Sequence, residues 1–199
     1  MAKSVKAQDT RQAIIETAAE LIHTKGFRET SINDIINSLG LTKGAFFYYF
    51  SNKKELGYAI IEYWRVKLHD RWVKPLEASQ DALTDLYSLP HRIYSEFSTE
   101  DIAMGCPLAN LATELSPVDD DFKARILGIY NMMENGAADA IRRGKLAGKI
   151  RADVDEMRLA RLYVDLNAGL RSVAKNTCDK DRLLGSLDLF RDYLEILRS

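Results

Sequence analysis

Five consecutive aromatic side chains follow a lysine and a glycine in the stretch LTKGAFFYYF, residues 41–50. A core strand, a ligand-binding box and a helix against DNA would all be rich in aromatic residues. If the stretch is helical, at about 100° per residue, Phe46 and Phe50 share one face. The remaining arc carries more exposed rings than an ordinary solvated surface, so it needs a partner. That arc consists of Lys43, Gly44, Ala45, Phe47, Tyr48 and Tyr49.

The chemistry of this arc suits DNA. A lysine can donate to guanine O6 and N7, and a glycine lets a helix backbone approach closely. A tyrosine hydroxyl, or a lysine at a helix start, suits a phosphate. Residues 1–54 carry eight Lys or Arg and five Asp or Glu, a surplus of three positive charges in a chain of net charge −1. A basic segment of this kind indicates a module for a polyanion.

A second candidate for chemistry is Cys106, in the segment GCPLANLATELS (105–116). The segment has the pattern of a helix start, and a helix N-terminus favours the thiolate, the reactive form of cysteine. Covalent modification of Cys106 would be a means of sensing. The alternative is that this cysteine is a small buried residue. Cys178 has no motif around it.

Metal and cofactor chemistry finds little support. The acidic run Asp119–Asp121 is best explained as favourable charge at a helix N-terminus. The three histidines have no carboxylate or cysteine at ligand spacing, and the two cysteines lie far apart. We therefore expect no metal and no cofactor. A plausible nucleophile–base pair and a phosphate loop are also missing from the sequence, which counts against an enzyme.

Two short helices with clear caps are predicted to hold the aromatic arc. Ser31 and Asp34 have the spacing of a capping box, and Gly40 ends the helix that they begin. Thr42 can cap the next helix, which runs through about Phe50. Two short helices around a tight turn have the proportions of a helix-turn-helix, whose second helix enters the major groove.

Helices are predicted on both sides of this pair. Apolar residues recur at helical spacing in residues 11–25, with Asp9 as the candidate N-cap. Asn52 and Glu55 begin another helix, which we expect to be long and to end at Pro75.

The rest of the chain is also predicted to be helical. Pro90 falls inside or at the end of a helical stretch, and residues 122–146 form a long periodic segment. Two strongly amphipathic helices follow, at residues 153–174 and 181–198. With no β-alternating run, internal repeat or low-complexity linker, the sequence predicts an all-α protein of about nine helices.

Length and composition limit the type of protein. A chain of 199 residues, 46% of them hydrophobic, suits one sizeable domain or a small module attached to a larger one. The sequence has no run of about 18 apolar residues and no apolar stretch of a signal peptide at its start. We expect a cytoplasmic protein that does not contact the membrane.

The stretch from residue 26 to residue 56 resembles the TetR family of bacterial transcriptional regulators. The family pattern G-F-x-x-T-[ST]-[VI]-x-x-[IL] corresponds to GFRETSINDI here. The pattern G-[VL]-[ST]-x-[GP]-x-[LF]-Y-x-[HY]-F-x-[SN]-K-x-x-L corresponds to GLTKGAFFYYFSNKKEL. The chain departs from the family at Phe47, where a tyrosine is usual. Without that hydroxyl, an apolar contact with a thymine methyl remains possible.

The resemblance implies roles for individual residues. It implies that Asn33, Lys43, Gly44 and Phe47 approach base edges. It further implies that Ser31, Tyr48, Tyr49 and Lys53 hold phosphates, with Thr42 and Ala45 completing the predicted set of DNA-binding residues.

One such module makes too few contacts for tight specific binding, so we expect a homodimer that reads the two half-sites of a palindrome in double-stranded DNA. The last two helices offer more apolar surface than one helix face needs, although each side chain could instead belong to the protomer's own core. The resemblance implies that this pair packs against its mate as a four-helix bundle. The predicted interface residues are Leu162, Leu166, Leu170, Leu187, Phe190 and Leu194.

The resemblance also implies a pocket in the middle helices for a small-molecule effector. Its predicted lining is Trp64, Phe97, Asn110, Tyr130, Tyr163 and Asn167. GCPLANLATELS looks like a segment of the subgroup related to the N-ethylmaleimide repressor, which includes sensors of electrophiles through a cysteine matching Cys106. The effector is therefore either a reversible ligand or an electrophile.

These observations favour a repressor with a DNA-binding domain at residues 1–54 and an effector-binding and dimerisation domain at residues 55–199. Two alternatives stay open. One is a small all-α enzyme whose aromatic segment binds substrate. The other is an architectural DNA-binding protein that senses nothing and binds DNA without sequence preference.

Overall fold

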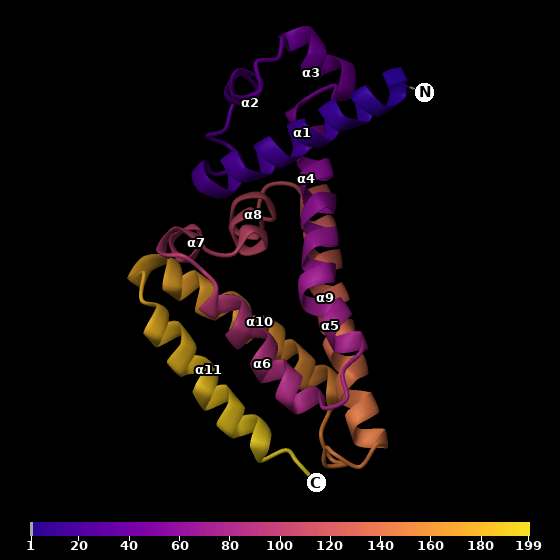
Figure 1. Ribbon diagram of the computed structural model, residues 1–199, viewed down its shortest axis with the longest axis vertical. Helices are drawn as coiled ribbons and strands as arrows, with labels where there is room; N and C mark the ends of the chain where they lie inside the picture. Colours follow the sequence, from indigo (N-terminus) through magenta and orange to yellow (C-terminus); the bar gives the residue numbers. More distant parts are fainter. Residues whose placement is uncertain (1) are drawn as a thin grey trace. The chain divides into compact units, whose positions relative to one another are not determined.

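The computed structural model describes the backbone of residues 2–199 and the side chains from residue 9 onward. Apart from one isolated β-bridge between Ile150 and Arg198, the regular structure in this range is helical (Figure 1). This confirms the predicted all-α class. Among the described helices, none is long and apolar enough to cross a membrane.

The chain divides into two compact units, which we describe separately. The first consists of the residues up to Val66 and of Asn110–Ile126. The boundary predicted after residue 54 separates DNA reading from effector binding rather than compact units, and it stays a prediction. The first unit contains α1 (Ala2–Lys25), α2 (Ile32–Ser38), α3 (Lys43–Tyr49), nearly all of α4 (Lys53–Leu68), residues 110–115 of α8 (Pro107–Leu115) and residues 120–126 of α9 (Asp120–Leu146).

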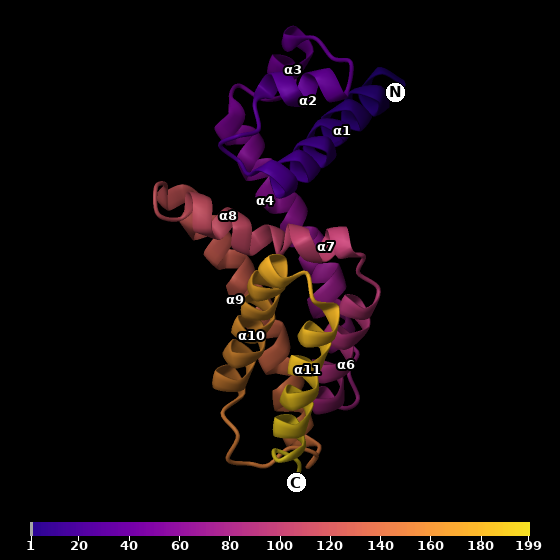
Figure 2. The same ribbon diagram turned by 90° about the vertical axis from the view of Figure 1, so that its left-hand side faces the viewer.

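The second unit consists of Lys67–Ala109 and Leu127–Ser199. Figure 2 shows α6, α10 and α11 side by side, and α11 contacts both of the others. Besides the remaining parts of α4, α8 and α9, this unit contains the π-helical turn η1 (His69–Val73), α5 (Lys74–Glu77), α6 (Ala82–Ser95), α7 (Thr99–Met104), α10 (Glu156–Thr177) and α11 (Lys180–Glu195). The short α7 is the helix that we had not expected from the sequence.

The predicted caps of α2 and α3 are confirmed. The Ser31 hydroxyl accepts from the Asp34 N–H at 3.1 Å, and Asp34 Oδ2 accepts from the Ser31 N–H at 2.8 Å. The Thr42 hydroxyl accepts from the Ala45 N–H at 3.2 Å. Each bond satisfies a backbone N–H that has no partner inside its own helix. The two helix starts are thus fixed by residues within three positions of each other.

The expectation that Asp9 caps the first helix is wrong. α1 begins at Ala2, so Asp9 lies inside the helix. The residues ahead of Asp9, AKSVKAQ, include no glycine or proline, and the helix therefore extends through them.

The expectation that the helix after Asn52 ends at Pro75 is also wrong. Helical backbone continues from α4 through η1 into α5, with Pro75 in the first turn of α5. A proline lacks an N–H, and its ring conflicts with the carbonyl four residues earlier. Here the Lys74 N–H donates to the His69 carbonyl, five residues earlier, so the helix is wider just before the proline. This wider turn accommodates Pro75 without ending the helix.

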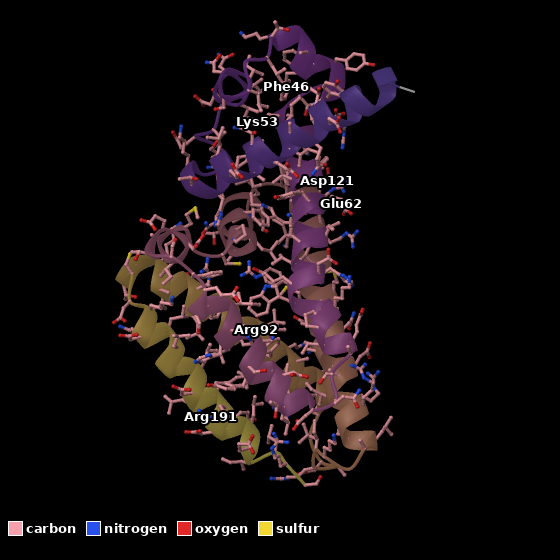
Figure 3. All side chains as sticks on the ribbon, in the orientation of Figure 1. Phe46, Lys53, Glu62, Arg92, Asp121 and Arg191 are labelled. Carbon is pink, nitrogen blue, oxygen red and sulfur yellow. The ribbon has the colours of Figure 1, made fainter. Side chains whose placement is uncertain are left out.

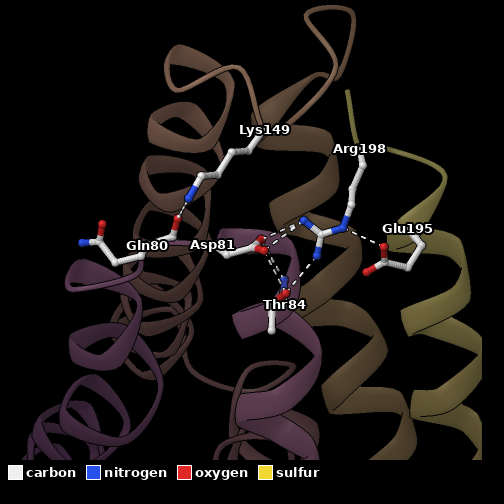
Figure 4. Close-up of polar contacts among 6 residues, drawn as sticks. All are labelled: Gln80, Asp81, Thr84, Lys149, Glu195 and Arg198. Atoms are coloured by element: carbon white, nitrogen blue, oxygen red, sulfur yellow. Dashed lines mark hydrogen bonds and ion pairs between the residues drawn. The ribbon is translucent and has the colours of Figure 1, made fainter.

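A polar cluster ties the C-terminal segment of the second unit to the start of α6 (Figure 4). Asp81 is the N-cap of α6, accepting from the Thr84 N–H at 3.3 Å, and its carboxylate lies 2.9 Å from the Arg198 guanidinium. Arg198 also pairs with Glu195 at 2.6 Å. The cluster lies beside the β-bridge of Arg198 to Ile150 and holds the chain end in place.

Candidate nucleic-acid interface and effector site

The two sides of α3 differ sharply in exposure. Phe46 is fully buried and Phe50 is 3% exposed, so these rings form the inner side of the helix, as predicted. Phe47 is 50% exposed and Tyr48 is 78% exposed. Lys43 and Gly44 are exposed on the same arc as Phe47 and Tyr48, because residues three and four positions apart lie on the same side of a helix. The outer side of α3 therefore carries the Lys43 ammonium, the backbone of Gly44 without a side chain, and the rings of Phe47 and Tyr48.

Gly44 has no evident steric role within the protein. A Cβ added at this position would meet nothing closer than the Thr42 hydroxyl, at 3.9 Å. Glycine in a helix is less stable than alanine by about 1 kcal/mol. A glycine that is unfavourable for its helix, on an exposed face, suits a surface that another molecule approaches closely.

The other predicted DNA-binding residues lie around this arc. Ser31 is exposed, but its hydroxyl already donates to Asp34 Oδ2 at 2.6 Å. Asn33 is exposed on α2, and Tyr49 is half-buried with its ring centroid 4.9 Å from that of Tyr48. The remaining two, Thr42 and Ala45, lie in the first turn of α3 as the cap and its donor.

Lys53 is engaged with the protein itself. Its Nζ donates to the Arg28 carbonyl at 3.2 Å and lies 4.6 Å from the centroid of the Phe27 ring. Partial burial lowers the pKa of the Lys53 ammonium, with nearby acids such as Glu114 opposing the effect. Figure 3 shows Lys53 and Phe46 within the first unit. Contact of Lys53 with a phosphate stays a prediction.

Glu114 of α8 is an organising residue that our sequence analysis did not single out. Its two carboxylate oxygens accept from the Phe27 N–H at 2.7 Å and the Arg28 N–H at 2.6 Å. Both amides belong to the turn between α1 and α2, which follows Gly26 at φ 94°. The carboxylate thus supplies acceptors to a turn that leads directly into the helix-turn-helix. The signal in the sequence was the glutamate of GCPLANLATELS.

The acidic run Asp119–Asp121, at the start of α9, lies in the same unit and has the predicted helix-start role. Asp119 Oδ1 accepts from the N–H groups of Asp121, at 3.0 Å, and Phe122, at 3.2 Å. Its other oxygen lies 2.7 Å from Lys54 Nζ. The Phe122 ring packs against Gly57 of α4, where an added Cβ would lie 2.7 Å from the ring. Gly57 is therefore needed for close helix packing.

In the second unit, part of the predicted effector lining comes together around Tyr94 of α6. The Tyr94 hydroxyl donates to Asn167 Oδ1 at 2.9 Å, and Asn167 Nδ2 donates to the Tyr163 carbonyl at 2.8 Å. Phe97 packs against Tyr94 with centroids 5.5 Å apart. Tyr163 is buried, and its hydroxyl has no hydrogen-bond partner among the described residues. Burial raises the pKa of Tyr94 and Tyr163 well above the usual tyrosine range.

Other predicted lining residues are placed differently. Trp64 and Asn110 belong to the first unit, where Trp64 contacts His23 with ring centroids 5.8 Å apart. Tyr130 of α9 is half-buried in the second unit, and burial raises its pKa to about 12. Cys106 is half-buried at the turn between α7 and α8. Its role as a sensor stays a prediction.

Arg171 of α10 is a second residue that sequence reasoning missed. Its side chain is 7% exposed, and its guanidinium carbon lies 4.3 Å from the centroid of the Phe97 ring. Nη2 donates to the carbonyls of Asp101, at 3.0 Å, and Gly105. An arginine on an amphipathic helix is normally solvated, so its burial could not be read from the local sequence.

The predicted interface residues divide into two groups according to their exposure. Leu187, Phe190 and Leu194 of α11 are at most 6% exposed within the protomer, so they belong to its own core. On α10, Leu162 is 43% exposed, and Leu166 and Leu170 are partly exposed. Leu166 and Leu170 line a groove of about 250 Å³ between α10 and α11. The interface set stays a prediction, and Val173, Leu189 and Tyr193 are further exposed apolar side chains on these two helices.

Comparison with known families matches both parts of the chain. Residues 14–60 match the family model of bacterial regulatory proteins of the tetR family. Residues 82–187 match the model of the tetracyclin repressor-like C-terminal domain. An uncharacterized HTH-type transcriptional regulator in the lacX 3′ region of Lactococcus lactis subsp. lactis is 34% identical over 137 residues, which are 66% of this chain and 68% of that protein.

More distant relatives include regulators with solved structures. A Saccharomonospora viridis protein described as a transcriptional regulator, solved in complex with choline, has a TM-score of 0.78 and 25% identity, covering 96% of this chain and 99% of that one. The repressor NemR of Escherichia coli is 22% identical over 117 residues, 58% of this chain and 59% of that protein. Its reduced form has a TM-score of 0.81 and 18% identity, covering 96% and 97% of the two chains. This similarity shows the fold and does not single out the NemR subgroup.

Proposed function

Because this chain belongs to the TetR family and is a DNA-binding transcriptional regulator rather than an enzyme, we propose that it is a homodimeric repressor released from a palindromic operator by an effector. The observation that carries the proposal is the exposed arc of Lys43, Gly44, Phe47 and Tyr48 on α3. The Lys43 ammonium and the Tyr48 hydroxyl are hydrogen-bond donors for base edges and phosphates. Gly44 lets the helix backbone approach the DNA, and the Phe47 ring can make apolar contacts with bases. We expect it to act in the cytoplasm, where bacterial DNA lies.

The exposed apolar side chains of α10 and α11 are the proposed dimer surface. A single helix-turn-helix buries too little area for tight specific binding, so two copies must engage one operator. Leu162, Val173 and Leu189 are between 43% and 73% exposed, and such apolar groups gain stability when a second copy covers them. The groove between the two helices would receive side chains of the partner.

Release requires that an effector disturb the contacts that hold the DNA-reading helices. α8 runs continuously from Pro107 to Leu115, with Cys106 at its start and Glu114 near its end. A change at the turn between α7 and α8 would therefore be carried along α8 to Glu114 and the turn after α1. Two kinds of effector fit this arrangement: a reversible ligand in the second unit, or an electrophile that modifies Cys106.

The first test is a DNA-binding titration of the purified chain against the DNA upstream of its own gene, at fixed physiological salt. Lys43→Ala should weaken binding about tenfold, because one good base contact contributes about 1–3 kcal/mol. Lys123→Ala removes the same charge from an exposed position of α9 and is the matched control. Binding that is indifferent to sequence and steeply salt-dependent would indicate the architectural alternative instead.

A second titration, with and without methylglyoxal, separates the two effector classes. Release of the wild type but not of Cys106→Ser would support an electrophile sensor. Equal release of both, or release of neither, would remove Cys106 from the mechanism and leave the reversible ligand. Cys178→Ser is the control, because Cys178 is the exposed second thiol.

A further inference from the structure

Arg171 is a buried cation with neutral hydrogen-bond partners. Its side chain is 7% exposed, and both acceptors of Nη2 are backbone carbonyls, those of Asp101 and Gly105. Nη1 is fully covered and has no hydrogen-bond partner among the described residues. A buried charged group with an unmade hydrogen bond is strongly unfavourable unless something compensates for it.

A second cation, Arg71, and one carboxylate, that of Asp101, lie near Arg171. Arg71 lies 5.3 Å from the centroid of Phe97, the ring that Arg171 approaches at 4.3 Å. The carboxylate of Asp101, on the neighbouring α7, is used by Ser98, whose N–H and hydroxyl both donate to it at 2.9 Å. The N-terminus of α8, the positive end of that helix, starts two residues after Gly105. Arg171 is therefore a buried cation with an unused N–H donor, and among the described residues the nearby Asp101 carboxylate makes no hydrogen bond to it.

We propose that Arg171 anchors the carboxylate of a small organic acid, which is the effector of this regulator. The acid would accept from Nη1, and its apolar body would pack against the rings of Phe97 and Tyr94. The inference rests on the proposed function, because it names the class of ligand that the effector site takes. It gives Nη1, the unpartnered nitrogen of a buried cation, a charge-assisted hydrogen bond.

A monocarboxylate fits this site better than phosphate or sulfate. Only the two N–H groups of Nη1 are in question, because Nη2 already serves two carbonyls. A divalent, strongly hydrated anion would have to lose its water for too few donors. The rings of Phe97, Tyr94 and Trp72, with Trp72 and Tyr94 centroids 5.8 Å apart, favour an apolar group attached to the carboxylate.

Binding at Nη1 would also have a structural consequence. Because Nη1 is covered, the acid must displace part of its cover, and the adjacent Nη2 holds the turn between α7 and α8 through Gly105. α8 starts from that turn and carries Glu114 near its other end. We therefore expect ligand entry to shift the turn from which α8 begins.

The test uses the full chain, thermal unfolding and calorimetric titration. The probes are benzoate, phenylacetate and hexanoate, each compared with its uncharged amide, and inorganic phosphate. We expect at least one acid to bind and to raise Tm with concentration, while its amide does not. Arg171→Met should weaken that acid at least about tenfold, and Arg171→Lys should weaken it less. Arg161→Met, on the exposed side of the same helix, should leave binding unchanged.

Several results would overturn the proposal. These are no binding by any of the three acids, equal binding of acid and amide, binding of phosphate alone, or unchanged affinity in Arg171→Met. If Arg171→Met does not fold, the acid and amide comparison and Arg171→Lys still decide. A parallel DNA titration separates this proposal from the proposed function. Operator binding without acid binding would reject the carboxylate effector and leave the proposed regulator standing. Acid binding at Arg171 without operator binding would support the carboxylate site and reject the proposed repressor function.

Discussion

The DNA-reading side of the first unit and the interior of the second unit are built in opposite ways. α2 and α3 have seven residues each and are capped by side chains within three positions of the amides that they serve. In the second unit, the Tyr94 hydroxyl meets Asn167 across 73 positions, and Arg171 meets the Asp101 carbonyl across 70. The starts of α2 and α3 depend on neighbours in sequence, whereas these two contacts of the second unit join residues that are neighbours only in space.

This difference matches the two kinds of partner that we propose, a DNA operator and a small-molecule effector. A region fixed by its own caps can leave its outer face exposed for a macromolecule, and Tyr48 is accordingly 78% exposed. A region held by long-range contacts encloses its polar groups, which suits a small molecule that replaces water. The cost of enclosure is that every buried donor needs an acceptor, and Arg171 Nη1 has none among the described residues.

The largest effect should come from the interior of the second unit. Leu187 is fully buried, whereas Leu189 of the same helix is 73% exposed. Leu187→Ala should lower the free energy of unfolding by about 2–5 kcal/mol, because it leaves a cavity. Leu189→Ala should change it by less than about 0.5 kcal/mol. Chemical denaturation of both variants measures the contrast, and equal small losses would place Leu187 outside the core.

Substitution of Glu114 tests whether the turn between α1 and α2 needs a long-range hydrogen-bond acceptor in addition to the local helix caps. Glu114→Gln loses one of two charge-assisted bonds and weakens the other, so stability should fall by about 1.5–3 kcal/mol. Hydrogen exchange of the Phe27 and Arg28 amides should accelerate, and DNA affinity should fall. Glu29→Gln removes the same charge from the neighbouring segment without touching these amides. Unchanged amide exchange at Phe27 and Arg28 in Glu114→Gln would show that the turn is stable without the Glu114 carboxylate.

Gly44 separates stability from DNA binding on the exposed face. Gly44→Ala should stabilise the free protein by up to about 1 kcal/mol, because α3 gains a better helix former and no clash. Its DNA affinity should nevertheless fall about tenfold, since the Cβ would block close approach of the backbone. Gly128→Ala, in α9 with nothing within 4 Å of the added Cβ, should show the stability gain alone. DNA affinity unchanged in Gly44→Ala would contradict the proposed interface.

The smallest effect concerns the cap of α2. Hydrogen bonds from the Ser31 hydroxyl and N–H lower the pKa of Asp34. The cap therefore stabilises α2 fully above the unfolded pKa of about 3.9, and this contribution is lost as pH falls through the lower folded value. Ser31→Ala should raise the pKa of Asp34 in an NMR titration. Ser38→Ala, whose hydroxyl reaches only the Asp34 carbonyl, should not.

The sequence determined the features that depend on neighbours along the chain. Capping boxes act over three positions and helical periodicity over four, so Ser31, Thr42 and the inward rings Phe46 and Phe50 could all be predicted. The motif around α3 indicated the family, which the comparisons confirm. Errors arose at Asp9 and Pro75, where continuing the helix was possible and a local stop signal was not decisive.

Only the tertiary structure decided which polar residues are buried and what they meet. Glu114 reaches Phe27 across 87 positions, and no periodic pattern encodes that pairing. Leu187 and Leu189 are the same residue type on the same helix, and their exposure differs because α6 covers one side of α11. The physical reason is that burial is a property of packed faces, whereas sequence signals describe a single helix at a time.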